Sequence, residues 1–75
     1  MFSIYPNPNN GSFVITSAEA GDLQLLNELG QVVHTMKVSG IEDEVVKVEN
    51  LSVGIYFITG RLGDQNISQK IIVSR

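Results

Sequence analysis

Cysteine and tryptophan are absent from the sequence, and histidine occurs only once, as His34. A chain without cysteine forms neither disulfides nor thiolate metal sites, so its stability must come from packing alone. His34 lies in a predicted strand without a nearby acidic pair at ligand spacing, and a metal site or catalytic triad needs convergent partners. The sequence therefore predicts no metal, no cofactor and no enzymatic activity.

Positive charge and long apolar runs are also scarce. Five basic residues are outnumbered by eight acidic ones, which gives a net charge of −3. A chain of that sign gains nothing from phosphate backbones or anionic lipid surfaces. No segment approaches the roughly 18 apolar residues that a membrane-spanning helix needs. We therefore expect neither nucleic-acid binding nor membrane insertion.

The 75 residues, of which 43% are hydrophobic and 17% charged, have the composition of a small folded domain. Strand-like sequence begins at once with residues 2–5. We therefore expect residues 1–75 to form a single domain that was excised from the end of a longer protein.

Short apolar stretches alternate with turn signals along the whole chain, and no helical period is present. This pattern predicts an all-β fold, an immunoglobulin-like antiparallel β-sandwich of about seven short strands. Loops are expected at residues 17–22, 40–44 and 62–66. The strands are expected at residues 2–5, 12–16, 44–49, 55–58 and 67–74, with a hairpin over 23–38.

Proline, asparagine and glycine mark the turns. Pro6-Asn7-Pro8 removes ladder donors and places the first strand at a sheet edge. Asn27-Glu28-Leu29-Gly30 fits a type I turn, with Asn first and Gly last. Gly54 is expected to have a positive φ before the next strand, and Gly60 is expected to mark a bulge or a close backbone approach.

The apolar run at residues 55–58 predicts the most buried strand of the fold. Ile55 and Phe57 would lie on one face and Tyr56 and Ile58 on the other, with both faces covered. In the preceding hairpin, Val33 is expected to return to the face of Leu23 and Leu25.

The last strand has two unlike faces. Alternation places Ile71 and Val73 in the core, and it places Lys70 and Ile72 on the opposite face, where a partner could reach them. An exposed terminal strand could also be recognised by strand addition to a partner's sheet. The acidic residues 42–44 lack the ligand spacing of a calcium loop and are predicted to form a solvated loop.

Four stretches carry motifs in a fixed order: residues 5–8 with Gly11, 27–30 with Val33, 51–56 and 70–73. In this order and spacing they resemble the C-terminal sorting domains of cargo proteins exported by the type IX secretion system (type A, the Por secretion family). The family's usual aspartate at the second stretch is Asn27 here, which keeps the side-chain acceptor that the turn needs. The turn residues that match the family motifs are Pro6, Asn7, Pro8, Gly11, Gly30, Gly54 and Tyr56.

The resemblance implies a non-enzymatic secretion signal that directs a cargo protein across the outer membrane. Such domains fold in the periplasm and are recognised by an outer-membrane translocon, for which Lys70, Ile71, Ile72 and Val73 are the candidate recognition residues. In many relatives a sortase-like protease at the cell surface then removes the domain and joins the cargo to a lipopolysaccharide anchor. The cargo would precede residue 1.

A second function class stays open, an immunoglobulin-like binding or spacer module of a surface adhesin. Fold alone does not separate it from a sorting signal. A binding module needs exposed aromatic side chains, however, and three of the five aromatics, Phe13, Tyr56 and Phe57, are expected to be buried. We therefore favour the sorting signal.

Overall fold

The computed structural model describes residues 2–41 and 45–74, and these residues form strands and connecting turns without any helix. No helix in this part of the chain is therefore long and apolar enough to cross a membrane. In chain order the strands are β1 (Phe2–Tyr5), β2 (Phe13–Ser17), β3 (Ala20–Leu26), β4 (Val32–Ser39), β5 (Val45–Val48), β6 (Gly54–Leu62) and β7 (Gln65–Val73).

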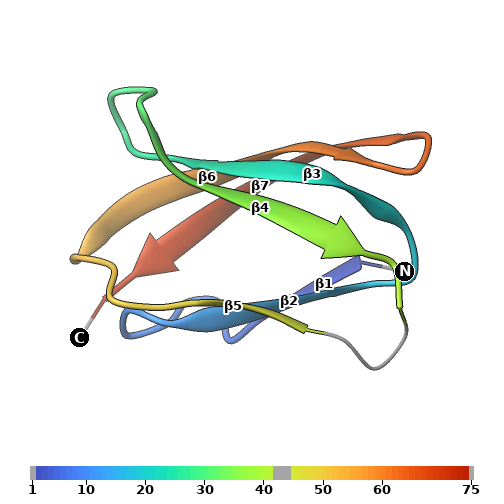
Figure 1. Ribbon diagram of the computed structural model, residues 1–75. Coiled ribbons are helices and arrows are strands. Elements are labelled where there is room, and N and C mark those ends of the chain that lie inside the picture. Colours follow the sequence, from blue (N-terminus) through green and yellow to red (C-terminus); the bar gives the residue numbers. More distant parts are fainter. Residues whose placement is uncertain (1, 42–44, 75) are drawn as a thin grey trace.

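The strands form two antiparallel sheets that pack face to face (Figure 1). One sheet has the order β1-β2-β5 and the other has the order β4-β3-β6-β7. In immunoglobulin terms β1, β2 and β5 take the places of strands A, B and E, while β4 joins the second sheet beside β3. This confirms the predicted immunoglobulin-like sandwich of seven strands and the edge position of β1.

The core lies between the two sheets and is built by alternation along each strand. Every second residue of β2, β3 and β7 points inward, so apolar residues at those positions meet across the layer. The buried apolar side chains are Phe13, Ile15, Leu23, Leu25, Met36, Val38, Val48, Ile58, Leu62, Ile71 and Val73.

The predicted loop at residues 17–22 is shorter than expected, because Ala20-Gly21-Asp22 already belongs to β3. Small residues are needed there because β3 and β6 approach closely: a Cβ at Gly21 would clash with the Arg61 carbonyl oxygen. Across the same pair of strands, a Cβ at Gly60 would clash with the Asp22 carbonyl oxygen. The predicted close approach at Gly60 is thus confirmed.

Two predictions about buried faces are wrong. Ile55 and Phe57 are only half-buried, because the sandwich has two layers and none of the described residues covers the outer side of β6. Val33 is 45% exposed and does not return to the core. The register between β3 and β4 shifts at this point, so that Leu25 pairs with His34 and Leu26 with Val32, and Val33 is the extra residue of the bulge.

The turn before β6 differs in detail from the expected one. Gly54 has a φ of +159°, which meets the prediction of a positive value but is close to fully extended backbone. The left-handed conformation belongs instead to Asn50, with a φ of +63°. The predictions for Glu42, Asp43 and Glu44 lie outside the described residues and stay predictions.

Candidate functional site

The segment after β1 is hydrogen-bonded to the outer edge of β7. The Asn7 side chain donates from Nδ2 to the Lys70 carbonyl oxygen (3.0 Å) and accepts from the Ile72 amide at Oδ1 (3.2 Å). The Asn9 amide donates to the Ile72 carbonyl oxygen (3.0 Å), and the Ser74 amide donates to the Asn9 carbonyl oxygen (2.8 Å). The first and fourth motif stretches, more than 60 residues apart in sequence, therefore form one unit.

Asn9 also fixes the turn that follows it. Its buried Oδ1 accepts from the Gly11 amide (2.9 Å), and the Gly11 carbonyl oxygen accepts from the Leu51 amide (3.1 Å). A Cβ at Gly11 would lie 3.1 Å from the Leu51 carbonyl oxygen, so a side chain would crowd this contact. The first stretch is thereby joined to the third as well. The link from Asn9 to β7 was not predictable from the sequence, because Ile72 and Ser74 lie more than 60 residues away in the chain.

The third stretch is held by a tyrosine corner. The Tyr56 hydroxyl donates to the Ser52 carbonyl oxygen four residues earlier (2.8 Å), and its ring packs against the core. The same contact closes the corner between the two sheets of immunoglobulin domains. The Leu51–Tyr56 stretch thus positions the start of β6.

The second stretch is the predicted turn of the β3–β4 hairpin. The Gly30 amide donates to the Asn27 carbonyl oxygen (3.0 Å), as a type I turn requires, and Gly30 has a φ of +82°. Asn27 Oδ1 accepts from the amides of Leu29 (2.9 Å) and Gln31 (3.0 Å). Asparagine keeps the acceptor oxygen of the family's aspartate, and its Nδ2 also donates to Gln31 Oε1 (3.0 Å).

All four stretches lie at one end of the sandwich, the end at which the C-terminus emerges (Figure 1). Residues of the second and third stretches line one shallow hollow, which contains Asn27 and Leu29 from one and Gly54 and Tyr56 from the other. Pro6-Asn7-Pro8 is exposed, and both of its X-Pro peptide bonds are cis. We call this set, residues 5–11, 27–31, 50–56 and 70–74, the motif end.

The fourth stretch presents two kinds of side chain at the motif end. Ile71 and Val73 are buried in the core, whereas Lys70 is exposed and Ile72 is 41% exposed. Alternation along β7 therefore places the four candidate recognition residues as the sequence predicted. Only Lys70 and Ile72 have side chains that another molecule could touch.

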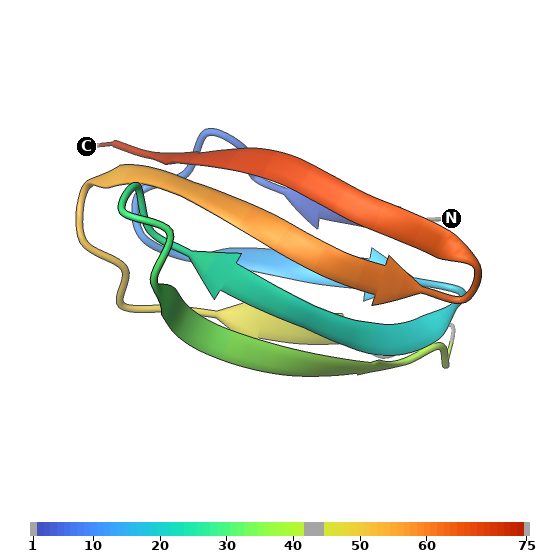
Figure 2. The ribbon, with the colours of Figure 1, turned by 90° about the horizontal axis from the view of Figure 1, so that it is seen from above.

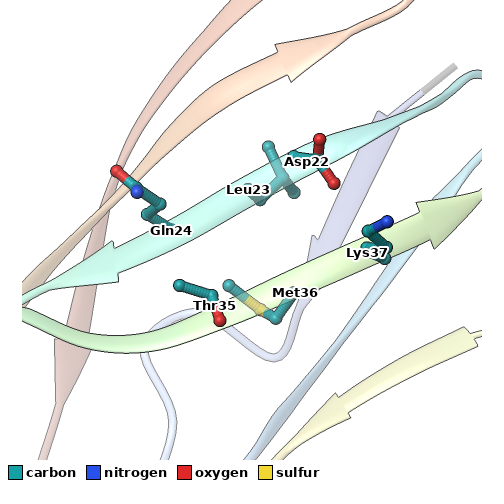
Figure 3. Close-up of a pocket in the computed structure, with 6 residues that line it drawn as sticks. All are labelled: Asp22, Leu23, Gln24, Thr35, Met36 and Lys37. Atoms are coloured by element: carbon teal, nitrogen blue, oxygen red, sulfur yellow. The ribbon is translucent and has the colours of Figure 1, made fainter.

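The side chains that could hold a metal ion are dispersed over residues 2–41 and 45–74. No cluster of three His, Asp or Glu side chains is present in this part of the chain. A hollow of about 340 Å³ lies between β3 and β4, and Figure 3 shows its lining. Its ionisable side chains are one carboxylate, Asp22, and one ammonium, Lys37, and it lies at the sheet edge opposite β7.

The comparisons with known proteins agree with this geometry. The family model of the secretion system C-terminal sorting domain matches residues 3–74, which is nearly the whole chain and includes all four stretches. A search of curated proteins found no match. The chain therefore belongs to the family of C-terminal sorting domains of the type IX secretion system.

Proposed function

We propose that residues 1–75 form the sorting domain at the C-terminus of a larger secreted protein, and that the domain acts without catalysis of its own. Membership in the family makes the domain a type IX secretion signal, and hence a signal for export across the outer membrane. In the proposed sequence of events the domain folds in the periplasm and is recognised by the outer-membrane translocon. A sortase-like protease at the surface then removes it and anchors the cargo.

The observation that supports recognition of a folded domain is the hydrogen bonding between Asn7, Asn9 and β7. These contacts occupy backbone groups of residues 70–74 that a strand-adding partner would need. They leave the side chains of Lys70 and Ile72 exposed. We therefore propose that the translocon contacts these two side chains, while Ile71 and Val73 keep β7 in the core.

Export of a reporter tests this proposal. A periplasmic reporter is fused in front of the 75 residues and expressed in a bacterium that has the type IX system and in a matched strain that lacks its translocon. The parent domain should bring the reporter to the surface or the medium only in the first strain. A double variant, Lys70→Ala with Ile72→Ser, should leave the reporter in the periplasm and should unfold within about 0.5 kcal/mol of the parent.

The matched control is Lys47→Ala with Val45→Ser, on the outer face of the other sheet, which should export normally. If the parent domain leaves the reporter in the periplasm, the sorting proposal is wrong and the adhesin module becomes the better account. If the folded Lys70/Ile72 variant is exported normally, the proposed contact with the translocon is instead assigned to Pro6–Gly11. The exported reporter should also have lost the mass of the domain, as removal at the surface requires.

A further inference from the structure

The outer face of the four-stranded sheet carries apolar side chains that no part of the described chain covers. Figure 2 looks directly onto this face, and β4, β3, β6 and β7 lie in front of the rest of the molecule. Five of its residues form what we call the apolar stripe: Leu26, Val32, Ile55, Phe57 and Ile72.

Strand pairing makes the apolar stripe continuous. Ile55 lies directly opposite Ile72, Phe57 opposite Leu26, and Leu26 opposite Val32, so each apolar residue has an apolar neighbour on the next strand. Residues directly opposite in an antiparallel pair share a face, with Cβ atoms about 5 Å apart. The bulge at Val33 is what turns Val32 outward. The stripe thus crosses all four strands.

The net charge of this face is opposite in sign to the net charge of the chain. Lys37, Arg61 and Lys70 point outward from its strands, against one carboxylate, Asp22, so the face carries +2 in a chain of net charge −3. Asp22 lies opposite both Lys37 and Arg61. Lys70 lies opposite Phe57, beside the apolar stripe. The ion pair found in the described residues, Lys47 with Glu49 at 3.4 Å, is on the other sheet.

We infer that the apolar stripe is the docking site for a protein of the export machinery whose surface is apolar and places a carboxylate against Lys70. The inference rests on the proposed function and extends recognition from β7 to all four strands. The molecule's two longer dimensions, 31 and 23 Å, give the whole outer face roughly 700 Å², and the apolar stripe is the central part of it, whereas each partner contributes approximately 800 Å² to a standard interface.

Charge selects this partner over two others. A second copy docked face to face would bring two surfaces of charge +2 together, and like-charge contacts oppose association. An anionic lipid surface is bound by clusters of roughly four to eight basic residues, and this face has three, two of which lie opposite Asp22. An acidic protein surface gains from Lys70 and covers the apolar stripe at the same time.

The test uses residues of the apolar stripe that lie outside β7. In the reporter fusion, Val32→Thr with Phe57→Thr should lower the exported fraction at least about tenfold, as loss of a central interface contact does. Threonine keeps the strand preference, so the variant should melt near the parent. The matched control, Val14→Thr with Val45→Thr, changes the outer face of the other sheet and should export as the parent does.

A second arm tests the charge. Lys70→Glu should reduce export by a similar factor, because it sets a carboxylate against the partner's carboxylate, whereas Lys47→Glu should not. Both lysines are exposed, so neither change threatens folding. If the Val32/Phe57 variant proves unfolded, the comparison of Lys70→Glu with Lys47→Glu tests the docking site in its place.

The outcomes separate this inference from the proposed function. If the parent domain does not export the reporter, both are wrong. If the parent and the folded stripe variant export equally well, only the docking inference is overturned, whereas normal export of Lys70→Glu also removes Lys70 from the proposed recognition site. Sedimentation of the purified domain at 100 µM should show a monomer; a dimer that the stripe variant abolishes would assign the apolar stripe to a second copy. Stripe-dependent binding to phosphatidylglycerol vesicles would assign it to lipid.

Discussion

Gly54 and Gly60 show how one residue type serves two purposes in a single strand. Both have positive φ values, +159° and +151°. The surroundings differ, since a Cβ at Gly54 would meet the Tyr56 ring at an ordinary 3.8 Å, while one at Gly60 would clash with the backbone of β3. Gly60 is therefore needed for the approach of two strands, whereas Gly54 has a nearly extended backbone and room for a Cβ.

Gly60→Ala should cost on the order of 2 kcal/mol more than Gly54→Ala. The two backbone angles are alike, so the difference in stability reports the clash, and overpacking costs about 1–3 kcal/mol. Urea unfolding of the two variants measures it. Equal losses would show that β3 and β6 can move apart at no cost.

Tyr56→Phe should destabilise the domain by about 1 kcal/mol, since it removes the hydrogen bond to the Ser52 carbonyl oxygen and leaves the ring in place. In a domain of this size that loss lowers the melting temperature by about 5 °C. Tyr5→Phe is the control, because Tyr5 is 51% exposed and its hydroxyl has no partner among the described residues. If Tyr56→Phe melts at the same temperature as Tyr5→Phe, the hydrogen bond of the tyrosine corner does not stabilise the domain.

Residues whose role depends on near neighbours could be predicted from the sequence, and others could not. The turn at Asn27–Gly30 was predictable because its contacts are all local. The exposure of Val33 was not, because the face of β4 that is buried, with Met36 and Val38, is decided by its pairing with β3. Gly21 was expected in a loop because the contact that requires a glycine there is made with Arg61 on another strand.

At the scale of elements, the segment 7–9 protects the edge of β7. An unpaired edge strand invites pairing with other chains, and Asn7 and Asn9 occupy the edge groups of Lys70, Ile72 and Ser74. The sequence predicted both β1 and β7 from alternation, and it predicted the turn at Pro6-Asn7-Pro8. It could not predict that this turn lies on β7, because nothing in a strand pattern identifies a partner more than 60 residues away.

Asn7→Ala should expose one particular amide. The Ile72 N–H donates to Asn7 Oδ1, so its hydrogen exchange should quicken by at least about tenfold, as loss of a protecting contact allows. The Ser74 amide, which donates to the backbone of Asn9, should keep its protection. Exchange followed by NMR distinguishes the two, with the exposed Asn10→Ala as control. Unchanged exchange at Ile72 would refute the Asn7 contact.

At the scale of the whole molecule, size decides what is exposed. The residues that the structure describes build two layers and no third, so each sheet has one face that they leave uncovered. The run at residues 55–58 suggested burial on both sides, but a chain this short could not supply the second cover. Chain length was therefore the signal that could have identified Ile55 and Phe57 as surface residues.

We propose that the four motif stretches act through the folded surface they build, and not as a linear tag. The most direct measurement is reporter export by Ile15→Asp, with periplasmic immunoblotting to show that the fusion is intact. Ile15 lies outside all four stretches and is fully buried, and a buried unpaired charge costs more than so small a domain can withstand. Thr16→Asp adds the same charge on the outer side of β2 and is the control. We expect Ile15→Asp to be unfolded and to stay in the periplasm, and Thr16→Asp to be exported. Export of the unfolded Ile15→Asp domain, with every motif residue still in place, would show that the motifs act as a linear tag.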